Sequence, residues 1–144
     1  MPPIPAQSTL ALLKFDANGL VPPDAGAEMT LAGYEFYPEA LANTIRWAHV
    51  AIGKPIYVTE SGVATRDDAR RIAFIDQALN GVRQCIDEGI KVHAYLYWSL
   101  LDNFEWTSGY GVPFGLAEVD RTTFKRTPRP SAFHLGAIAR ANRI

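Results

Sequence analysis

The chain has 144 residues, of which 48% are hydrophobic and 20% are charged, and its formal net charge is −1. This composition is typical of a folded globular segment and excludes an intrinsically disordered chain. The 14 Lys and Arg residues are scattered along the sequence, which argues against a nucleic-acid partner because phosphate binding requires clustered positive charge.

Prolines and glycines interrupt residues 1–33 too often for regular secondary structure. We predict an extended arm or loop over residues 1–33, with one short strand or turn at residues 10–15 and the remainder irregular. The regular elements are expected in residues 34–144, which form the second part of the chain.

The first helix is predicted to begin at Pro38, because the missing N–H of a proline costs nothing at the first helical position. Gly53 is expected to end this helix. A short apolar, β-rich run over residues 55–59 follows and stops at Glu60, so it is predicted to be a strand. The apolar residues of the helix fall on one face: Leu41, Ile45, Ala48 and Ile52.

A polar loop leads from this strand into a second helix, which Asp67 or Asp68 can cap. The densest basic group of the chain lies here and comprises Arg66, Arg70 and Arg71. We interpret it as the solvated start of the helix rather than as a binding patch. The apolar positions of the helix step by three and four residues, as in an amphipathic helix: Ile72, Ile75, Leu79, Val82 and Ile86.

Residues 91–101 are almost all apolar or aromatic, which predicts a strand that is buried on both faces. After a loop, residues 116–120 and 123–126 predict a hairpin, and residues 130–142 predict a last helix. Two apolar strands joined by a crossover of helical length indicate parallel βα units. Two such units leave unpaired strand edges, so the pattern describes only part of a larger α/β architecture.

In parallel α/β barrels, reactive groups gather at the carboxyl ends of the strands. Glu60 follows the first predicted strand, and Trp98 stands near the end of the second. Aromatic rings beside carboxylates suit sugars, whose apolar C–H faces are rimmed by hydroxyl groups, and Glu105, Trp106 and Phe114 extend this combination. Two simpler interpretations stay open at this point, namely a solvated loop glutamate and aromatic residues that fill a core.

Two motifs make the sequence resemble a known family. They are YVTESG (residues 57–62) and YWSLLDNFEW (residues 97–106), and the match continues through FGL (residues 114–116) and RTP (residues 126–128). Together they closely resemble the C-terminal part of the glycoside hydrolase family 1 β-glucosidases, over roughly residues 18–140. The sequence departs from the family pattern at Ser61, where Asn is commoner, and at Pro113, where Arg is usual.

The resemblance implies a (β/α)8 TIM barrel, of which this chain contains the seventh and eighth βα units and the preceding helix. It implies that Glu60 is the catalytic nucleophile and that four residues bind the sugar. It also implies a cis peptide bond after Trp98, unphosphorylated β-glycoside substrates, and neither a cofactor nor a metal. The sugar-binding residues are Trp98, Glu105, Trp106 and Phe114.

A retaining glycosidase needs a second carboxyl group, about 5–5.5 Å from the nucleophile, to protonate the leaving oxygen. The family carries it in an Asn-Glu-Pro motif, which these 144 residues lack. We therefore expect that a β-glycosidase site forms only when a complementary chain or self-association supplies the missing half. The alternatives are a catalytically silent, carbohydrate-binding or vestigial module, and a truncated product, which we favour for the chain itself.

The remaining candidates for special chemistry are few. Cys85 is the single cysteine and lies in an apolar helical pattern, so we expect a buried, inert thiol. His49, His93 and His134 have no spacing that suits a metal. No apolar run is long enough to span a membrane, and no secretion signal is recognisable. A cytoplasmic location without membrane contact is therefore expected.

Overall fold

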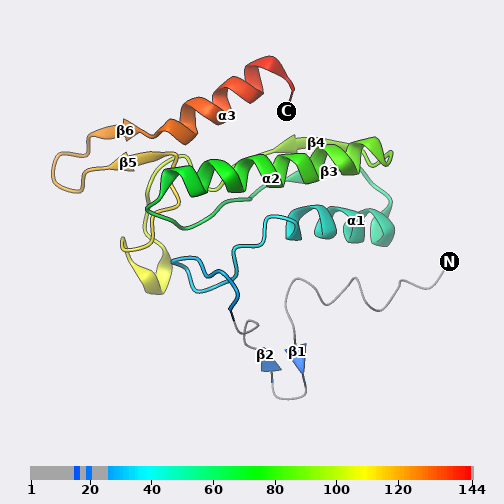
Figure 1. Cartoon of the computed structure of the whole chain (residues 1–144), viewed down its shortest axis with the longest axis horizontal. Helices are drawn as coiled ribbons and strands as arrows, with labels where there is room; N and C mark the ends of the chain where they lie inside the picture. Colours follow the sequence, from blue (N-terminus) through cyan, green and yellow to red (C-terminus); the bar gives the residue numbers. More distant parts are fainter. Residues whose placement is uncertain (1–14, 17–18, 21–25, 144) are drawn as a thin grey trace.

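The computed structural model describes residues 15–16, 19–20 and 26–143 (Figure 1). At the start, β1 (Phe15–Asp16) pairs antiparallel with β2 (Gly19–Leu20). The short strand or turn expected at residues 10–15 lies, apart from Phe15, outside the described residues. The same holds for most of the arm expected over residues 1–33.

Helix α1 (Ala40–Ile52) begins two residues later than predicted. Pro38 lies in the turn before it, because the N–H groups of Ala40 and Leu41 bond to carbonyls only three residues back and an α-helical bond first forms from Asn43. Gly53 ends the helix as predicted, with a φ of 58° in the left-handed region that glycine adopts readily. The predicted apolar face is wrong at its last position, since Ile52 is 62% exposed.

Strands β3 (Ile56–Val58) and β4 (Val92–Tyr95) are parallel neighbours. Helix α2 (Asp68–Asp87) forms the crossover between them, so the predicted βα units are confirmed. The predicted burial of the second strand on both faces is wrong. Leu96 and Leu100 of the predicted strand are each more than half exposed, as is Tyr57 of β3, and in the described part of the chain this sheet has only two strands.

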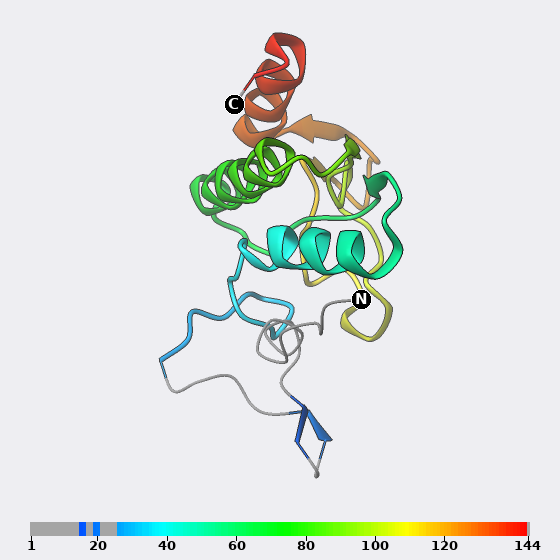
Figure 2. The ribbon, with the colours of Figure 1, turned by 90° about the vertical axis from the view of Figure 1, so that its right-hand side faces the viewer.

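Helix α2 lies between α1 and α3 (Pro130–Ala141), as Figures 1 and 2 show. The Asp67 side chain caps α2 by accepting hydrogen bonds from the N–H groups of Ala69 and Arg70. One apolar cluster joins α1, the sheet and α2 around Ile45, Val58 and Cys85, and a second joins α2 to α3. Cys85 is fully buried, as predicted.

Strands β5 (Ala117–Val119) and β6 (Arg126–Pro128) form the predicted antiparallel hairpin. Strand β6 begins later than expected, because the Asp120 carboxylate accepts hydrogen bonds from Thr122 and Thr123 and holds that segment in a turn. Helix α3 follows at once and confirms the last predicted helix, although Phe133 on it is 67% exposed. Among the described residues, no helix has both the length and the apolar character needed to cross a membrane.

Candidate active site

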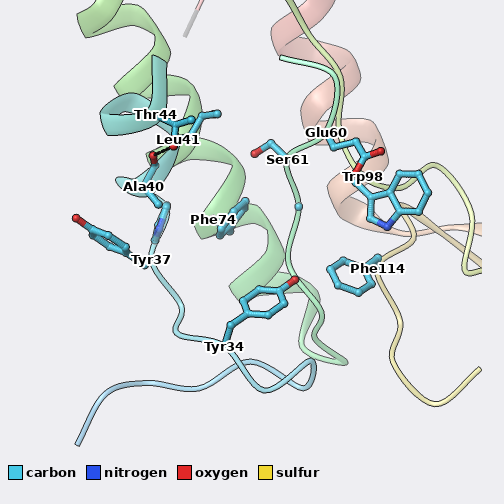
Figure 3. A pocket seen from close by; sticks show the side chains of 12 residues that line it. Tyr34, Tyr37, Ala40, Leu41, Thr44, Glu60, Ser61, Phe74, Trp98 and Phe114 are labelled. Atoms are coloured by element: carbon cyan, nitrogen blue, oxygen red, sulfur yellow. Dashed lines mark hydrogen bonds between the residues drawn. The ribbon is translucent and has the colours of Figure 1, made fainter. Parts of the chain in front are cut away.

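The carboxyl ends of β3 and β4 bring Glu60 and Trp98 to one cavity, beside each other in Figure 3. The backbone pairing continues past the strands, since the Trp98 N–H donates to the Ser61 carbonyl at 2.9 Å. Gly62 permits this approach, because a Cβ on it would lie 1.7 Å from the Trp98 carbonyl oxygen. The peptide bond between Trp98 and Ser99 is cis, as the family resemblance implies.

An open cavity of about 400 Å³ lies in front of these strand ends. Three of the five predicted site residues, Glu60, Trp98 and Phe114, line it together. Phe114 is held there through the backbone, because its carbonyl accepts the Ser99 N–H and Leu116 donates to the Ser99 carbonyl. Figure 3 shows the Glu60 carboxyl group next to the Trp98 indole, with the Phe114 ring below them.

The loop after β4 places the other two predicted residues differently. Glu105 accepts a hydrogen bond from the Trp98 indole, with 3.2 Å between Nε1 and Oε1, so its carboxylate is attached to a residue that lines the cavity. Trp106 opens the short 3-10 helix η1 (Trp106–Ser108) and has a positive φ of 42°. It is 85% exposed and does not line the cavity.

Several aromatic residues of the cavity were not identified from the sequence. Tyr34 and Tyr37, which precede α1, and Phe74 of α2 line it opposite Glu60 (Figure 3). Partial burial and, secondarily, the negative charge of Glu105 raise the pKa of Tyr34 to about 12. This phenol therefore stays protonated, and able to donate a hydrogen bond, at neutral pH. None of the three stands at the end of a predicted strand or among the apolar positions of a predicted helix. The sequence therefore carried no signal for them.

Three carboxylates that follow β3 and β4 in the sequence are engaged elsewhere. Asp67 caps α2, Asp68 pairs with Arg71 and Ser131, and Asp102 forms a two-bond ion pair with Arg129. Among the described residues that line the cavity, Glu60 carries the only carboxyl group. Within the same described part of the chain, no three His, Cys, Asp or Glu side chains gather to hold a metal ion.

A parallel βα pair with polar and aromatic side chains at the carboxyl ends of its strands matches the repeating unit and the site position of a (β/α)8 barrel. The model of glycosyl hydrolase family 1 matches residues 11–144, and the chain belongs to this family. A β-galactosidase from Sulfolobus acidocaldarius is 39% identical over 112 residues, which are 78% of this chain and 23% of that protein.

Solved structures agree with this assignment. The apo structure of β-glucosidase 1317 is 55% identical and superposes with a TM-score of 0.85 over 88% of this chain and 31% of its own. The Thermotoga maritima β-glucosidase in complex with glucoimidazole is 29% identical, with a TM-score of 0.84 over 92% of this chain and 32% of its own. The chain thus spans about a quarter to a third of the length of the relatives that it matches, and its fold is a partial barrel.

Proposed function

We propose that this chain supplies the nucleophile half of a retaining β-glycosidase site that hydrolyses terminal, non-reducing β-D-glycosides. The observation that carries the proposal is the shared cavity of Glu60 and Trp98 at two neighbouring strand ends. A carboxylate beside a flat aromatic ring matches a sugar in which one face is apolar and the anomeric carbon is the electrophile.

In the proposed reaction, a Glu60 oxygen attacks the anomeric carbon while the bond to the leaving oxygen breaks. A general acid protonates that oxygen, and a covalent glycosyl–Glu60 ester remains. Water then attacks the same carbon, gives its proton to the group that acted as the acid, and releases Glu60. Trp98 is the proposed floor of the sugar site and Phe114 its wall. Glu105 and Trp106 are the proposed partners of the sugar hydroxyls.

The general acid is proposed to come from outside the described cavity lining, in which Glu60 is the only carboxyl group. The matched relatives are about three times as long as this chain, and the further strands of such a barrel are the proposed source. They would be supplied by a longer polypeptide, a complementary chain or an assembly of copies. The division into an arm (residues 1–33) and a partial barrel (residues 34–144) stays a prediction, as does the cytoplasmic location.

Covalent labelling tests the nucleophile separately from the acid. A 2-deoxy-2-fluoro-β-glucoside with a dinitrophenolate leaving group needs no protonation of the leaving oxygen, so it labels a competent nucleophile without the second carboxyl group. We expect mass spectrometry to find one fluoroglucosyl group on the peptide that contains Glu60, and none in Glu60→Gln. Glu118→Gln, at an exposed position of β5, is the matched control and should be labelled normally. A label elsewhere would contradict the assignment.

A second function, a sugar-binding module without turnover, is supported by the same single carboxyl group in the cavity. Hydrolysis of an aryl β-glucoside separates the two functions. Turnover that Glu60→Gln abolishes supports the enzyme, whereas saturable sugar binding with neither turnover nor covalent labelling supports the binding module.

A further inference from the structure

The three arginines at the start of α2 donate hydrogen bonds to backbone carbonyls of other segments, although Arg66 is exposed. Arg70 donates from both terminal nitrogens to the Met29 carbonyl at 3.3 Å. Arg71 donates to the carbonyls of Thr65 and Pro113. Arg66 donates to the Gly111 carbonyl at 2.9 Å. The interpretation of this group as a solvated helix start is therefore wrong for Arg71, which is fully buried.

Arg71 connects the segment after Glu60 to the residue before Phe114. A guanidinium carries five N–H donors in a planar fork, so one side chain can bond carbonyls from two separate segments. The Thr65 N–H also donates to the Pro113 carbonyl, at 3.2 Å, so the two segments meet at Arg71. Asp68 pairs with Arg71, which supplies the counter-charge that a buried cation requires.

Arg70 holds a different segment, the loop over residues 28–36. Besides the Met29 carbonyl, it forms an ion pair with Glu28 at 2.6 Å and stacks 4.6 Å over the centre of the Phe36 ring. The loop closes on itself, because the Phe36 N–H donates to Glu28 and the Thr30 N–H donates to Tyr34. Tyr34 of this loop lines the cavity. Arg70 is thus attached to the wall of the cavity that faces Glu60.

We propose that Arg70 and Arg71 are positioning residues of the cavity, with Arg70 fixing the Tyr34 wall and Arg71 fixing the Phe114 wall. Neither is a catalytic residue, since neither lines the cavity. These loop segments have some backbone hydrogen bonds, and the forks of donors from the first turn of α2 add side-chain bonds that fix the loops to a rigid helix. The role in sugar binding rests on the proposed function of the cavity, whereas the anchoring of the loops does not.

Amide hydrogen exchange, followed by NMR on the 144-residue chain, tests the anchoring without a ligand. In Arg70→Gln we expect about tenfold faster exchange at Thr30 and Phe36, with Thr65 and Leu116 unchanged. In Arg71→Lys, which keeps the charge but loses the fork, we expect about tenfold faster exchange at Thr65 and Ser99, with Thr30 unchanged. Lys is chosen because removing the buried charge altogether can prevent folding. Arg83→Gln, at an exposed position of the same helix, is the matched control.

Exchange that stays as in the wild type at these amides, or that rises equally along α2 and α3, would overturn the anchoring. A second experiment measures the binding of isofagomine, a cationic glucose mimic, through the change in tryptophan fluorescence. We expect the Kd to rise about five- to tenfold in Arg70→Gln and Arg71→Lys and to stay unchanged in Arg83→Gln. If the wild-type chain binds and both variants bind equally well, the positioning role in binding is wrong. If the wild-type chain does not bind, the isolated chain has no formed sugar site, and the exchange rates alone decide the anchoring.

Discussion

The Trp98 indole N–H donates a hydrogen bond to the Glu105 carboxylate, with 3.2 Å between Nε1 and Oε1. Trp98 comes from the end of the second strand of the parallel pair, and Glu105 comes from the loop that follows it. The bond keeps the negative charge of Glu105 at the edge of the cavity that Glu60 lines, close enough to Tyr34 to contribute to its raised pKa. This position of the carboxylate is consistent with the proposed role of Glu105 as a partner of sugar hydroxyls.

Glu105→Gln tests the charge of this carboxylate. The amide oxygen of Gln can still accept the indole N–H, so we expect the free energy of unfolding to change by less than about 0.5 kcal/mol. The affinity for isofagomine, measured by fluorescence titration, should fall about tenfold because the charge-assisted contact is lost. Glu118→Gln on the exposed hairpin is the control. An unchanged affinity in Glu105→Gln would show that the carboxylate does not meet the ligand.

Gly62→Ala tests the close approach of the two strand ends. The added Cβ would lie 1.7 Å from the Trp98 carbonyl oxygen, so the two backbones must separate. We expect a loss of about 2–3 kcal/mol in the free energy of unfolding, measured with urea, and a changed NMR signal from the Trp98 indole N–H. At Gly111, the nearest atom to an added Cβ is 3.5 Å away, so Gly111→Ala is expected to change neither measurement. Equal effects at both glycines would contradict the argument.

The parts of the site that follow from local pattern were predictable from the sequence. A β-rich run that ends at Glu60 and a second apolar run that leads to Trp98 indicate parallel strands, and parallel strands bring their carboxyl ends to one edge. The burial of the second strand was not predictable in this way, because it depends on neighbours outside the two strands. Leu100, for example, is 68% exposed despite its apolar surroundings in the sequence.

Contacts between loops that are distant in the sequence could not be predicted from it either. Arg71 lies in a polar helix start and looks solvated, yet it is fully buried because its partners include the carbonyl of Pro113, 42 residues away. Tyr34 precedes a helix in an aperiodic segment, and only the folded loop over residues 28–36 brings it to the cavity. Residues that act through such tertiary contacts leave no periodic signal.

Asp68 is expected to make stability depend on pH in the acidic range. Burial alone would raise the pKa of Asp68, but hydrogen bonds from Ser131 and Arg71 outweigh burial and lower the pKa below its ordinary value. A lowered pKa means that the folded state binds fewer protons than the unfolded state. The stabilisation is therefore present above the unfolded pKa, about 3.9, and is lost as the pH falls through the folded value.

Urea unfolding between pH 7 and pH 3 measures this dependence. Asp68→Asn should lower the free energy of unfolding at pH 7 by roughly 2–4 kcal/mol, because the buried Arg71 loses its counter-charge, and should flatten the acidic slope. Asp87→Asn, at an exposed position of the same helix, should leave the slope as in the wild type. An equally steep slope in Asp68→Asn would assign the dependence to other carboxylates.

Cys85 is expected to resist alkylation in the folded protein. Its side chain is fully buried in the cluster around Ile45 and Val58, and burial raises the pKa of its thiol. Because the thiolate is the reactive form, iodoacetamide at pH 8 should react at least about a hundredfold more slowly with the native chain than with the urea-unfolded chain. The raised pKa also means that stability should fall as the pH rises above about 8.5. Rapid alkylation without urea would show that this cluster opens readily.

The open face of the parallel pair is expected to drive self-association of the isolated 144-residue chain. Tyr57 of β3, and Leu96 and Leu100 after β4, are each more than half exposed, beside strands whose outer edges are unpaired in the described residues. Exposed apolar patches and free strand edges both favour association.

Light scattering after size exclusion should therefore give a mass above that of the monomer. In the double variant Leu96→Glu/Leu100→Glu, the mass should fall towards that of the monomer. Phe133→Glu, which places a carboxylate at a similarly exposed position on α3, is the control on another element and should leave the association unchanged. A monomeric wild-type chain would show that these exposed residues and strand edges do not drive self-association.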